Sequence, residues 1–197
     1  DLGILVDELE KSEADVVHIS PSHHFPTGIV TPISRRYELL GWAAASTDRY
    51  IIEDDYDNEY HFNQRPIMPI SSFEGIRNYV YIGTLSKLIA PAVRVGYIVS
   101  NKDFILKIGR LRKMVDLQGD AIMEQSILDL IISGDIRRHQ KRMLTHYQAK
   151  RDFFANLLDQ YMKDKVLYKK PDGGLAFWLK PIKNIDLYQL KEKVNFE

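Results

Sequence analysis

From residue 50 to residue 56 the chain reads Tyr50-Ile51-Ile52-Glu53-Asp54-Asp55-Tyr56, an apolar run that ends abruptly in carboxylates. A second run, Tyr79-Val80-Tyr81-Ile82-Gly83-Thr84-Leu85-Ser86-Lys87, ends in small polar residues and a lysine. Both have the β-branched and aromatic content of buried strands. Open α/β sheets place their ligand chemistry at strand ends, so we expect these two ends to meet in one site.

The residues before this stretch predict a β-α-β unit. Residues 14–20 alternate as a strand, and residues 35–46 carry apolar positions on one helical face, with Ser34 as the expected N-cap. A strand, a helix and a second strand in that rhythm imply a parallel sheet covered by helices. We expect residues 79–83 and 93–100 to join the same sheet, and residues 5–11 to form a short helix.

The residues after this stretch predict mostly helix. Residues 103–115 and 121–132 have apolar residues at helical spacing and are expected to be core helices, the second ending at Gly134. A long helix is predicted from about 136 to 161, with an apolar stripe that must be buried. Beyond it, residues 166–168 and 175–179 predict a hairpin around the turn 169–174.

The composition is that of a globular chain. The 197 residues are 45% hydrophobic and 27% charged, enough for one large domain or one domain with part of another. No apolar run approaches the roughly 20 residues that span a bilayer, and residues 1–3 do not begin a signal peptide, so a cytoplasmic location is expected. The 27 basic and 27 acidic residues balance, giving no field that attracts nucleic acid, and the absence of cysteine excludes a disulfide framework.

At Lys87 the sequence resembles a known family. The segments Ile51 to Asp57, Tyr81 to Lys87 and Arg94-Val95-Gly96-Tyr97 look like the cofactor site of pyridoxal 5'-phosphate (PLP)-dependent aminotransferases of fold type I. More narrowly, the chain is similar to the aminotransferase-like domain of MocR-type regulators in the GntR superfamily. Residues 21–28 and 137–151 fit the same branch, so the resemblance spans nearly the whole chain.

The resemblance implies an α/β architecture in two parts. Residues 1–134 would be a partial PLP-binding large domain, with a mostly parallel sheet flanked by helices. Residues 135–197 would be a linker helix and the start of a smaller, truncated α+β C-terminal domain. The family's phosphate-binding loop and its winged-helix DNA-binding domain would precede Asp1, and its substrate-binding arginine would follow Glu197.

The same resemblance assigns roles to the strand-end residues. Lys87 would carry PLP as a Schiff base, and Asp54 would hold the protonated pyridine nitrogen, which lets the ring act as an electron sink. Tyr56 would face the phenolic oxygen; strand alternation places positions 54 and 56 on one side.

The phosphate would be held by two hydroxyls and a guanidinium, which supply donors suited to an anion. By the family pattern these belong to Thr84, Ser86 and Arg94.

One loop departs from the aminotransferase pattern. Aminotransferases carry an asparagine before Pro-Thr-Gly, which bonds the phenolic oxygen, whereas this chain has Phe25 there. The departure favours the regulator branch. The neighbouring His23 and His24 fit equally a pair of solvated loop residues or a pair that lines the site.

Two charged segments allow another interpretation, one as a metal site and one as a DNA-binding surface. The carboxylates from Glu53 to Glu59 could hold a divalent metal in a phosphohydrolase, but no Gly-x-x-x-x-Gly-Lys loop accompanies them and a metal would leave Lys87 and Arg94 unexplained. The basic run 137–142 suggests DNA binding, yet it lies on a helix with a long apolar stripe and has no helix-turn-helix partner.

The expected function follows from the family. The chain would be the effector domain of a transcriptional regulator, a homodimer that holds PLP on Lys87, senses an amine or amino acid, and signals by closure to a DNA-binding domain outside this chain. The alternative is a catalytic PLP-dependent aminotransferase in which Lys87 moves the substrate's proton. Neither function implies a metal or a membrane.

Overall fold

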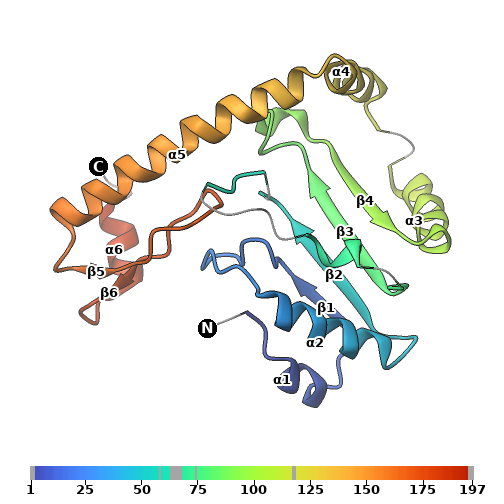
Figure 1. The fold of residues 1–197 in the computed structure, drawn as a ribbon, viewed down its shortest axis with the longest axis horizontal. Helices are drawn as coiled ribbons and strands as arrows, with labels where there is room; N and C mark the ends of the chain where they lie inside the picture. Colours follow the sequence, from blue (N-terminus) through green and yellow to red (C-terminus); the bar gives the residue numbers. More distant parts are fainter. Residues whose placement is uncertain (1–2, 58, 63–67, 74, 117–118, 195–197) are drawn as a thin grey trace.

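A four-stranded sheet forms the centre of the chain (Figure 1). The computed structural model describes residues 3–57, 59–62, 68–73, 75–116 and 119–194. The strands are β1 (Val16–Ile19), β2 (Tyr50–Asp55), β3 (Tyr79–Thr84) and β4 (Gly96–Ser100), paired in that order. The first two pairings are parallel and the third is antiparallel, so the predicted mostly parallel α/β sheet is confirmed.

Two helices cover one face of this sheet. α1 (Val6–Lys11) and α2 (Ile33–Ala44) bury a core with β1 and β2, whose members are Val6, Leu9, Val17, Ile19, Leu39, Trp42, Ala43, Ile51 and Ile70. Burial alternates along β2, with Ile51, Glu53 and Asp55 on the core side. Asp54 therefore faces the opposite side of the sheet, as the period of two requires.

The expected cap of α2 is wrong. The helix begins at Ile33 after Pro32, and no side chain caps it. Ser34 lies inside the first turn instead, because the helix starts at Ile33, directly after the extended Pro32, and Ser34 is therefore one residue too late to be the cap.

A buried arginine ties α2 to the loops around the sheet. Arg36, fully buried, donates to the backbone carbonyls of Thr31, Met68 and Pro21 at 2.8–3.0 Å. Its guanidinium lies 3.9 Å from Glu53, which also accepts from the backbone amides of the short 3-10 helix η1 (Ile70–Ser72). Burial lowers the pKa of Arg36 and raises that of Glu53, each opposed by the partner's charge.

The antiparallel pair β3–β4 is built around a glycine. Gly83 pairs with Tyr97, and a Cβ at Gly83 would collide with the Tyr97 ring. The Tyr97 ring thus packs over the backbone of Gly83, and its centroid lies 6.1 Å from that of the Tyr81 ring. A second short 3-10 helix, η2 (Pro91–Val93), precedes β4.

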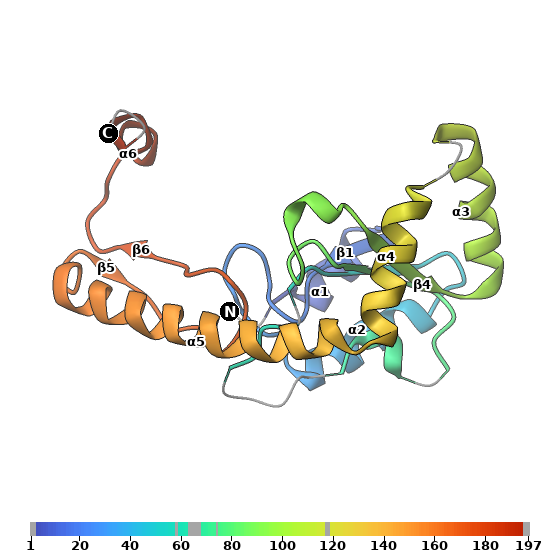
Figure 2. The same cartoon turned by 90° about the horizontal axis from the view of Figure 1, so that it is seen from above.

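The prediction that residues 103–115 and 121–132 are core helices is wrong. They form α3 (Lys102–Val115) and α4 (Ala121–Ile132), but α3 buries no residue and α4 buries only Ile127. Both helices stand at the β4 side of the sheet, where the described residues cover only part of their apolar surface (Figures 1 and 2). Helical periodicity identified their apolar faces, but it carries no information on what covers them.

The long helix and the C-terminal segment follow. α5 (Asp135–Tyr161) runs from α4 to the two-stranded sheet of β5 (Val166–Leu167) and β6 (Lys180–Pro181), and α6 (Leu187–Val194) comes last. The stripe on α5 is only partly buried: Leu158 is buried, whereas Tyr161 is 63% exposed. None of the described helices is long and apolar enough to cross a membrane.

The prediction that residues 175–179 form the return strand of the hairpin is wrong. β5 pairs with residues 180–181 rather than with 175–179. The earlier residues are held elsewhere, since the Leu175 amide donates to Asp57 and Gly174 to the Tyr60 carbonyl. The boundary between residues 134 and 135 stays a prediction.

Candidate functional site

A cavity of about 480 Å³ opens at the carboxyl ends of β1 and β2, on the face opposite α1 and α2. Three residues singled out from the sequence line it together: Lys87, Asp54 and Tyr56. Asp54 and Tyr56 come from β2 and the residue after it, and Lys87 from the turn after β3. The other lining residues are His18, Ile19, Ser20, His24 and Phe25.

A histidine on the neighbouring strand faces the Asp54 carboxylate. His18 Nε2 lies 3.4 Å from Asp54 Oδ2, and the two side chains are 62% and 39% exposed. In the sheet register His18 pairs with Ile52, which lies two residues before Asp54 and therefore on the same face of the sheet. The pair puts a carboxylate with a basic partner on the cavity wall.

Tyr56 presents a hydroxyl that stays protonated. Burial, with the charges of Asp57, Asp54 and Asp55, raises the pKa of Tyr56 to about 12. The hydroxyl donates to the backbone carbonyl of His23 at 2.9 Å. Phe25 meets the Tyr56 ring edge to face, with 6.3 Å between centroids, at the position where aminotransferases carry an asparagine.

Lys87 lies on a turn that is held by a hydrogen bond from Tyr60. Tyr60 OH donates to the Lys87 backbone carbonyl at 2.8 Å, and the turn closes with Ile89 N on the Leu85 carbonyl. The side chain of Lys87 is exposed to the cavity rather than packed in the core.

The three residues expected to hold a phosphate do not line this cavity. Thr84 Oγ1 accepts from the Ser86 amide at 3.2 Å and lies 3.5 Å from the Val95 carbonyl. Arg94 is exposed and adopts a left-handed backbone with φ of 52° after η2. Thr84 and Ser86 flank the lysine turn, as in the expected arrangement, but nothing in the described residues shows a closed anion site there.

Three other carboxylates of the acidic stretch, Glu53, Asp55 and Asp57, do not line this cavity and have partners of their own. Glu53 accepts from two backbone amides, Asp55 Oδ2 from Tyr81 OH at 2.7 Å, and Asp57 Oδ1 lies 2.7 Å from His23 Nδ1. Burial raises the pKa of Asp55, against the hydrogen bond from Tyr81, and Asp55 Oδ1 is buried without a partner. Among the described residues, no three histidine or acidic side chains converge as metal ligands.

The two loop histidines have different places. His24 lines the cavity, whereas the His23 ring is 95% buried against Asp57. His18 was missed from the sequence, although alternation along β1 puts it on the exposed side, which is also that of Asp54. A second hollow of about 350 Å³ adjoins the first and shares His18, Ile19 and His24 with it.

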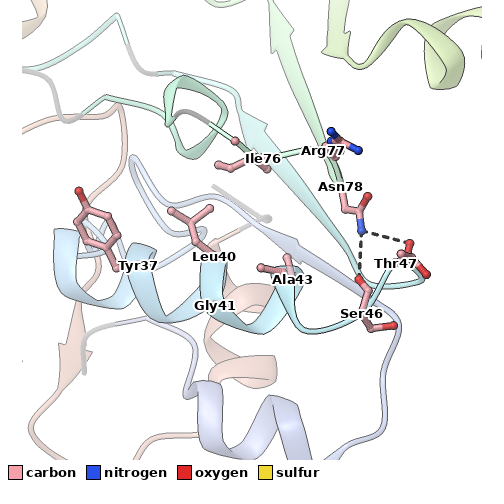
Figure 3. A pocket seen from close by; sticks show the side chains of 11 residues that line it. Tyr37, Leu40, Gly41, Ala43, Ser46, Thr47, Ile76, Arg77 and Asn78 are labelled. Carbon is pink, nitrogen blue, oxygen red and sulfur yellow. Dashed lines mark hydrogen bonds between the residues drawn. The ribbon is translucent and has the colours of Figure 1, made fainter.

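A further cavity of about 550 Å³ lies elsewhere on the molecule. It separates α2 from residues 75–78, with Tyr37 and Leu40 on the helix side and Ile76 opposite (Figure 3). Asn78 Nδ2 closes one end by donating to the carbonyls of Ser46 and Thr47, both at 3.1 Å. It contains none of the residues predicted to form a site.

Sheet, helices and cavity together define a fold-type I aminotransferase-like region. The chain is similar to an uncharacterized HTH-type transcriptional regulator of Bacillus subtilis, YhdI, at 29% identity over 90% of this chain and 38% of that protein. It is equally similar to aromatic-amino-acid aminotransferase 1 of Thermococcus litoralis, at 29% identity over 95% of this chain and 45% of the enzyme. No family model matches.

Solved aminotransferases have the same fold. Kynurenine aminotransferase of Pyrococcus horikoshii, solved with PMP and with kynurenine as substrates, superposes with a TM-score of 0.90 at 25% identity, over 100% of this chain and 50% of that one. The multiple substrate aminotransferase of Thermococcus profundus gives 0.88 at 26% identity, over 98% and 50%. This chain therefore spans about half the length of the proteins it matches.

Proposed function

We propose that this chain is the PLP-binding, aminotransferase-like effector region of a transcriptional regulator, with Lys87 as the residue that carries PLP. One observation carries the proposal: Lys87, Asp54 and Tyr56 line the same cavity, although Lys87 lies some thirty residues after the other two. An amine, a carboxylate and a phenol are the groups that the aldehyde, the pyridine nitrogen and the phenolic oxygen of PLP require.

Each cavity residue has a definite task in this proposal. The Lys87 amine would hold PLP covalently at its aldehyde carbon, with the aldehyde oxygen leaving as water. The Asp54 carboxylate, with His18 beside it, holds a proton at the ring nitrogen. The Tyr56 hydroxyl, whose pKa burial raises to about 12, would turn its one proton from the His23 carbonyl to the phenolic oxygen. PLP, when bound, supplies the electron sink and the carbon that an amino group can attack.

Two features favour a regulator. The chain is similar over 98% of its length to the HTH-type transcriptional regulator NorG of Staphylococcus aureus, at 24% identity. In the cavity, Phe25 stands where the aminotransferase pattern has an asparagine, so the phenolic oxygen has one donor fewer.

The second candidate is a catalytic aminotransferase acting on an amino acid. It is favoured by the 29% identity to the Thermococcus litoralis enzyme over 95% of this chain. The same three cavity residues would serve it, with Lys87 moving the proton of the substrate carbon.

The test is to identify the lysine that binds PLP in the full-length protein. PLP is added, the visible absorbance is recorded, the adduct is reduced with borohydride, and the labelled peptide is sequenced. We expect the label on Lys87, and no visible band in Lys87→Ala although circular dichroism shows an unchanged fold. Lys102→Ala, a surface lysine of α3, is the matched control. A label on another lysine would refute the assignment.

A second measurement separates the two candidates. The PLP-loaded protein is mixed with a panel of amino acids and 2-oxoglutarate, and glutamate formation is followed. A regulator should show a spectral change with its effector but no sustained glutamate formation, whereas an aminotransferase should turn over steadily, at roughly 1 per second or more.

A further inference from the structure

A buried pair behind the cavity joins it to the C-terminal segment. His23 and Asp57 are 5% and 1% exposed, and His23 Nδ1 lies 2.7 Å from Asp57 Oδ1. Neither residue lines the cavity. A hydrogen bond between two buried side chains fixes both of them in place, so this pair can set the geometry of the segments that carry it.

The pair closes a ring of contacts around the site's tyrosine. Asp57 follows Tyr56 in the chain, Asp57 holds the His23 ring, and the His23 carbonyl accepts the Tyr56 hydroxyl at 2.9 Å. The orientation of the tyrosine is thus set by the backbone at residue 23. The hydrogen bond between the His23 side chain and Asp57 in turn holds that backbone in place.

The other oxygen of Asp57 reaches the turn at residues 172–175. Asp57 Oδ2 accepts from the Leu175 amide at 3.1 Å. The turn packs directly on the histidine: a Cβ added at Gly173 would collide with His23 Nε2 and with the Tyr60 carbonyl. Gly174, with φ of +77°, donates its amide to the same carbonyl. Only glycine fits this turn, because the ring of His23 occupies the space a side chain would need.

A parallel connection reaches the lysine. Tyr60 receives the Gly174 amide on its backbone carbonyl, and its hydroxyl donates to the Lys87 carbonyl at 2.8 Å. The segment from Tyr56 to Tyr60 therefore lies between the cavity and the glycine turn. A shift of the Gly173–Gly174 turn would therefore move both Tyr56 and Lys87.

We propose that the His23–Asp57 pair is a positioning element that sets the Tyr56 hydroxyl according to how the Gly173–Gly174 turn is seated. This couples the C-terminal segment to the amine-binding cavity. The inference rests on the proposed function, because its readout is PLP bound in that cavity. It concerns residues that have no contact with the cavity itself.

The test uses a substitution in the turn, far from the reacting groups. In the full-length protein, Gly173→Ala forces a methyl group against the His23 ring, whereas Gly41→Ala adds the same group on α2 where nothing lies within 4 Å. We expect Gly173→Ala to weaken PLP binding about three- to tenfold, the effect of misplacing one hydrogen bond, and to move the visible absorbance maximum toward that of Tyr56→Phe. Gly41→Ala should change neither quantity.

The decisive arm is a double mutant. If the turn acts through Tyr56, Gly173→Ala should have little further effect on the PLP dissociation constant in the Tyr56→Phe background, since coupled changes are not additive. Equal effects in both backgrounds would overturn the inference. Asp57→Asn, which keeps the side-chain shape, should reproduce the shift, and it carries the test should Gly173→Ala fail to fold.

The outcomes for the two proposals are distinct. If the wild-type protein forms no visible PLP adduct, the proposed function fails and this inference falls with it. If the wild type binds PLP and Gly173→Ala behaves as Gly41→Ala, only the positioning role is wrong.

Discussion

At the scale of single residues, neighbouring carboxylates on one strand have opposite environments. Asp54 faces the cavity beside His18, whereas Asp55 is 96% buried on the other side with one oxygen on Tyr81 and the other without a partner. Alternation along β2 is the whole cause of the difference. It lets the two positions be tested against each other with the same chemical change.

The first prediction compares these carboxylates in PLP chemistry. Asp54→Asn should still bind PLP on Lys87 but should slow proton removal from an amino acid by about two orders of magnitude, because the ring nitrogen loses its proton. Asp55→Asn should change this rate by less than about threefold. Deuterium exchange at the substrate carbon, followed by NMR, measures the rate, and the reverse ranking would show that Asp55 is the ring partner.

The second prediction concerns pH and Asp55. Burial raises its pKa, so the folded state binds the proton more tightly than the unfolded state, whose pKa is about 3.9. The stability from this group is full below about pH 4 and is lost as the pH rises through the raised pKa. Asp55→Asn should therefore gain stability over the wild type above about pH 4, with a gap that widens as the pH rises toward the raised pKa and stays level beyond it.

Urea unfolding at several pH values checks this gap. Glu53 and Glu59 also have raised pKa values, in part from the charge of Asp55, so Asp55→Asn lowers both and adds to the same gap. A gap that is the same at about pH 4 and at about pH 8, or that narrows as the pH rises, would contradict the prediction.

At the scale of elements, α2 is held by hydrogen bonds as well as by its apolar face. Arg36 satisfies three backbone carbonyls from two loops and faces Glu53, all in the interior. The sequence showed the apolar stripe of this helix but not the arginine beneath it. An arginine in a helix is solvated far more often than buried.

The third prediction is that Arg36 is essential to this packing. Arg36→Met should destabilise the fold by about 3–5 kcal/mol, since it leaves Glu53 and three carbonyls without their donor. Arg35→Met removes one bond, to the Ile4 carbonyl, and a partly exposed pair with Glu38, and should cost about 1 kcal/mol. Thermal or urea unfolding gives both values, and similar losses would mean that the Arg36 network is not the cause.

At the scale of the whole molecule, large apolar side chains remain exposed over the β4 side and the C-terminal segment. They include Tyr97, Ile98, Val99, Leu111, Met114, Val115, Ile122, Ile131, Ile132, Leu187, Tyr188 and Val194. Such an extent of apolar surface is typical of an interface rather than of a monomer's exterior.

The fourth prediction is that residues 1–197 alone self-associate through this surface. Light scattering after size exclusion should give a mass that rises with concentration. Combining Val115→Glu on α3 with Ile122→Glu on α4, both at positions more than 80% exposed, should lower that mass. Lys113→Glu, also on α3, should have little effect. A concentration-independent monomer would contradict this.

The fifth prediction is that the same fragment binds PLP weakly. Its cavity holds the lysine, the carboxylate and the phenol but no closed phosphate site among the described residues. Each missing phosphate contact is worth roughly 1.5–3 kcal/mol, so the loss of two or three weakens binding by orders of magnitude. Titration with PLP measures the affinity, and tight one-to-one binding by a monomer would show that other contacts hold the phosphate.

The sequence by itself determined the four strands of the main sheet, the helices, and the placement of Lys87, Asp54 and Tyr56 at strand ends, but not the return strand after β5. Period-two and period-3.6 patterns are local, and the ends of parallel strands meet at one edge whatever else the chain does. The tertiary structure alone decided that α3 and α4 are exposed and that Leu175 donates to Asp57 instead of pairing with β5. It also decided that His18 lies on the cavity wall and that His23 is buried behind it. These outcomes depend on contacts between segments far apart in the chain, about which local periodicity carries no information.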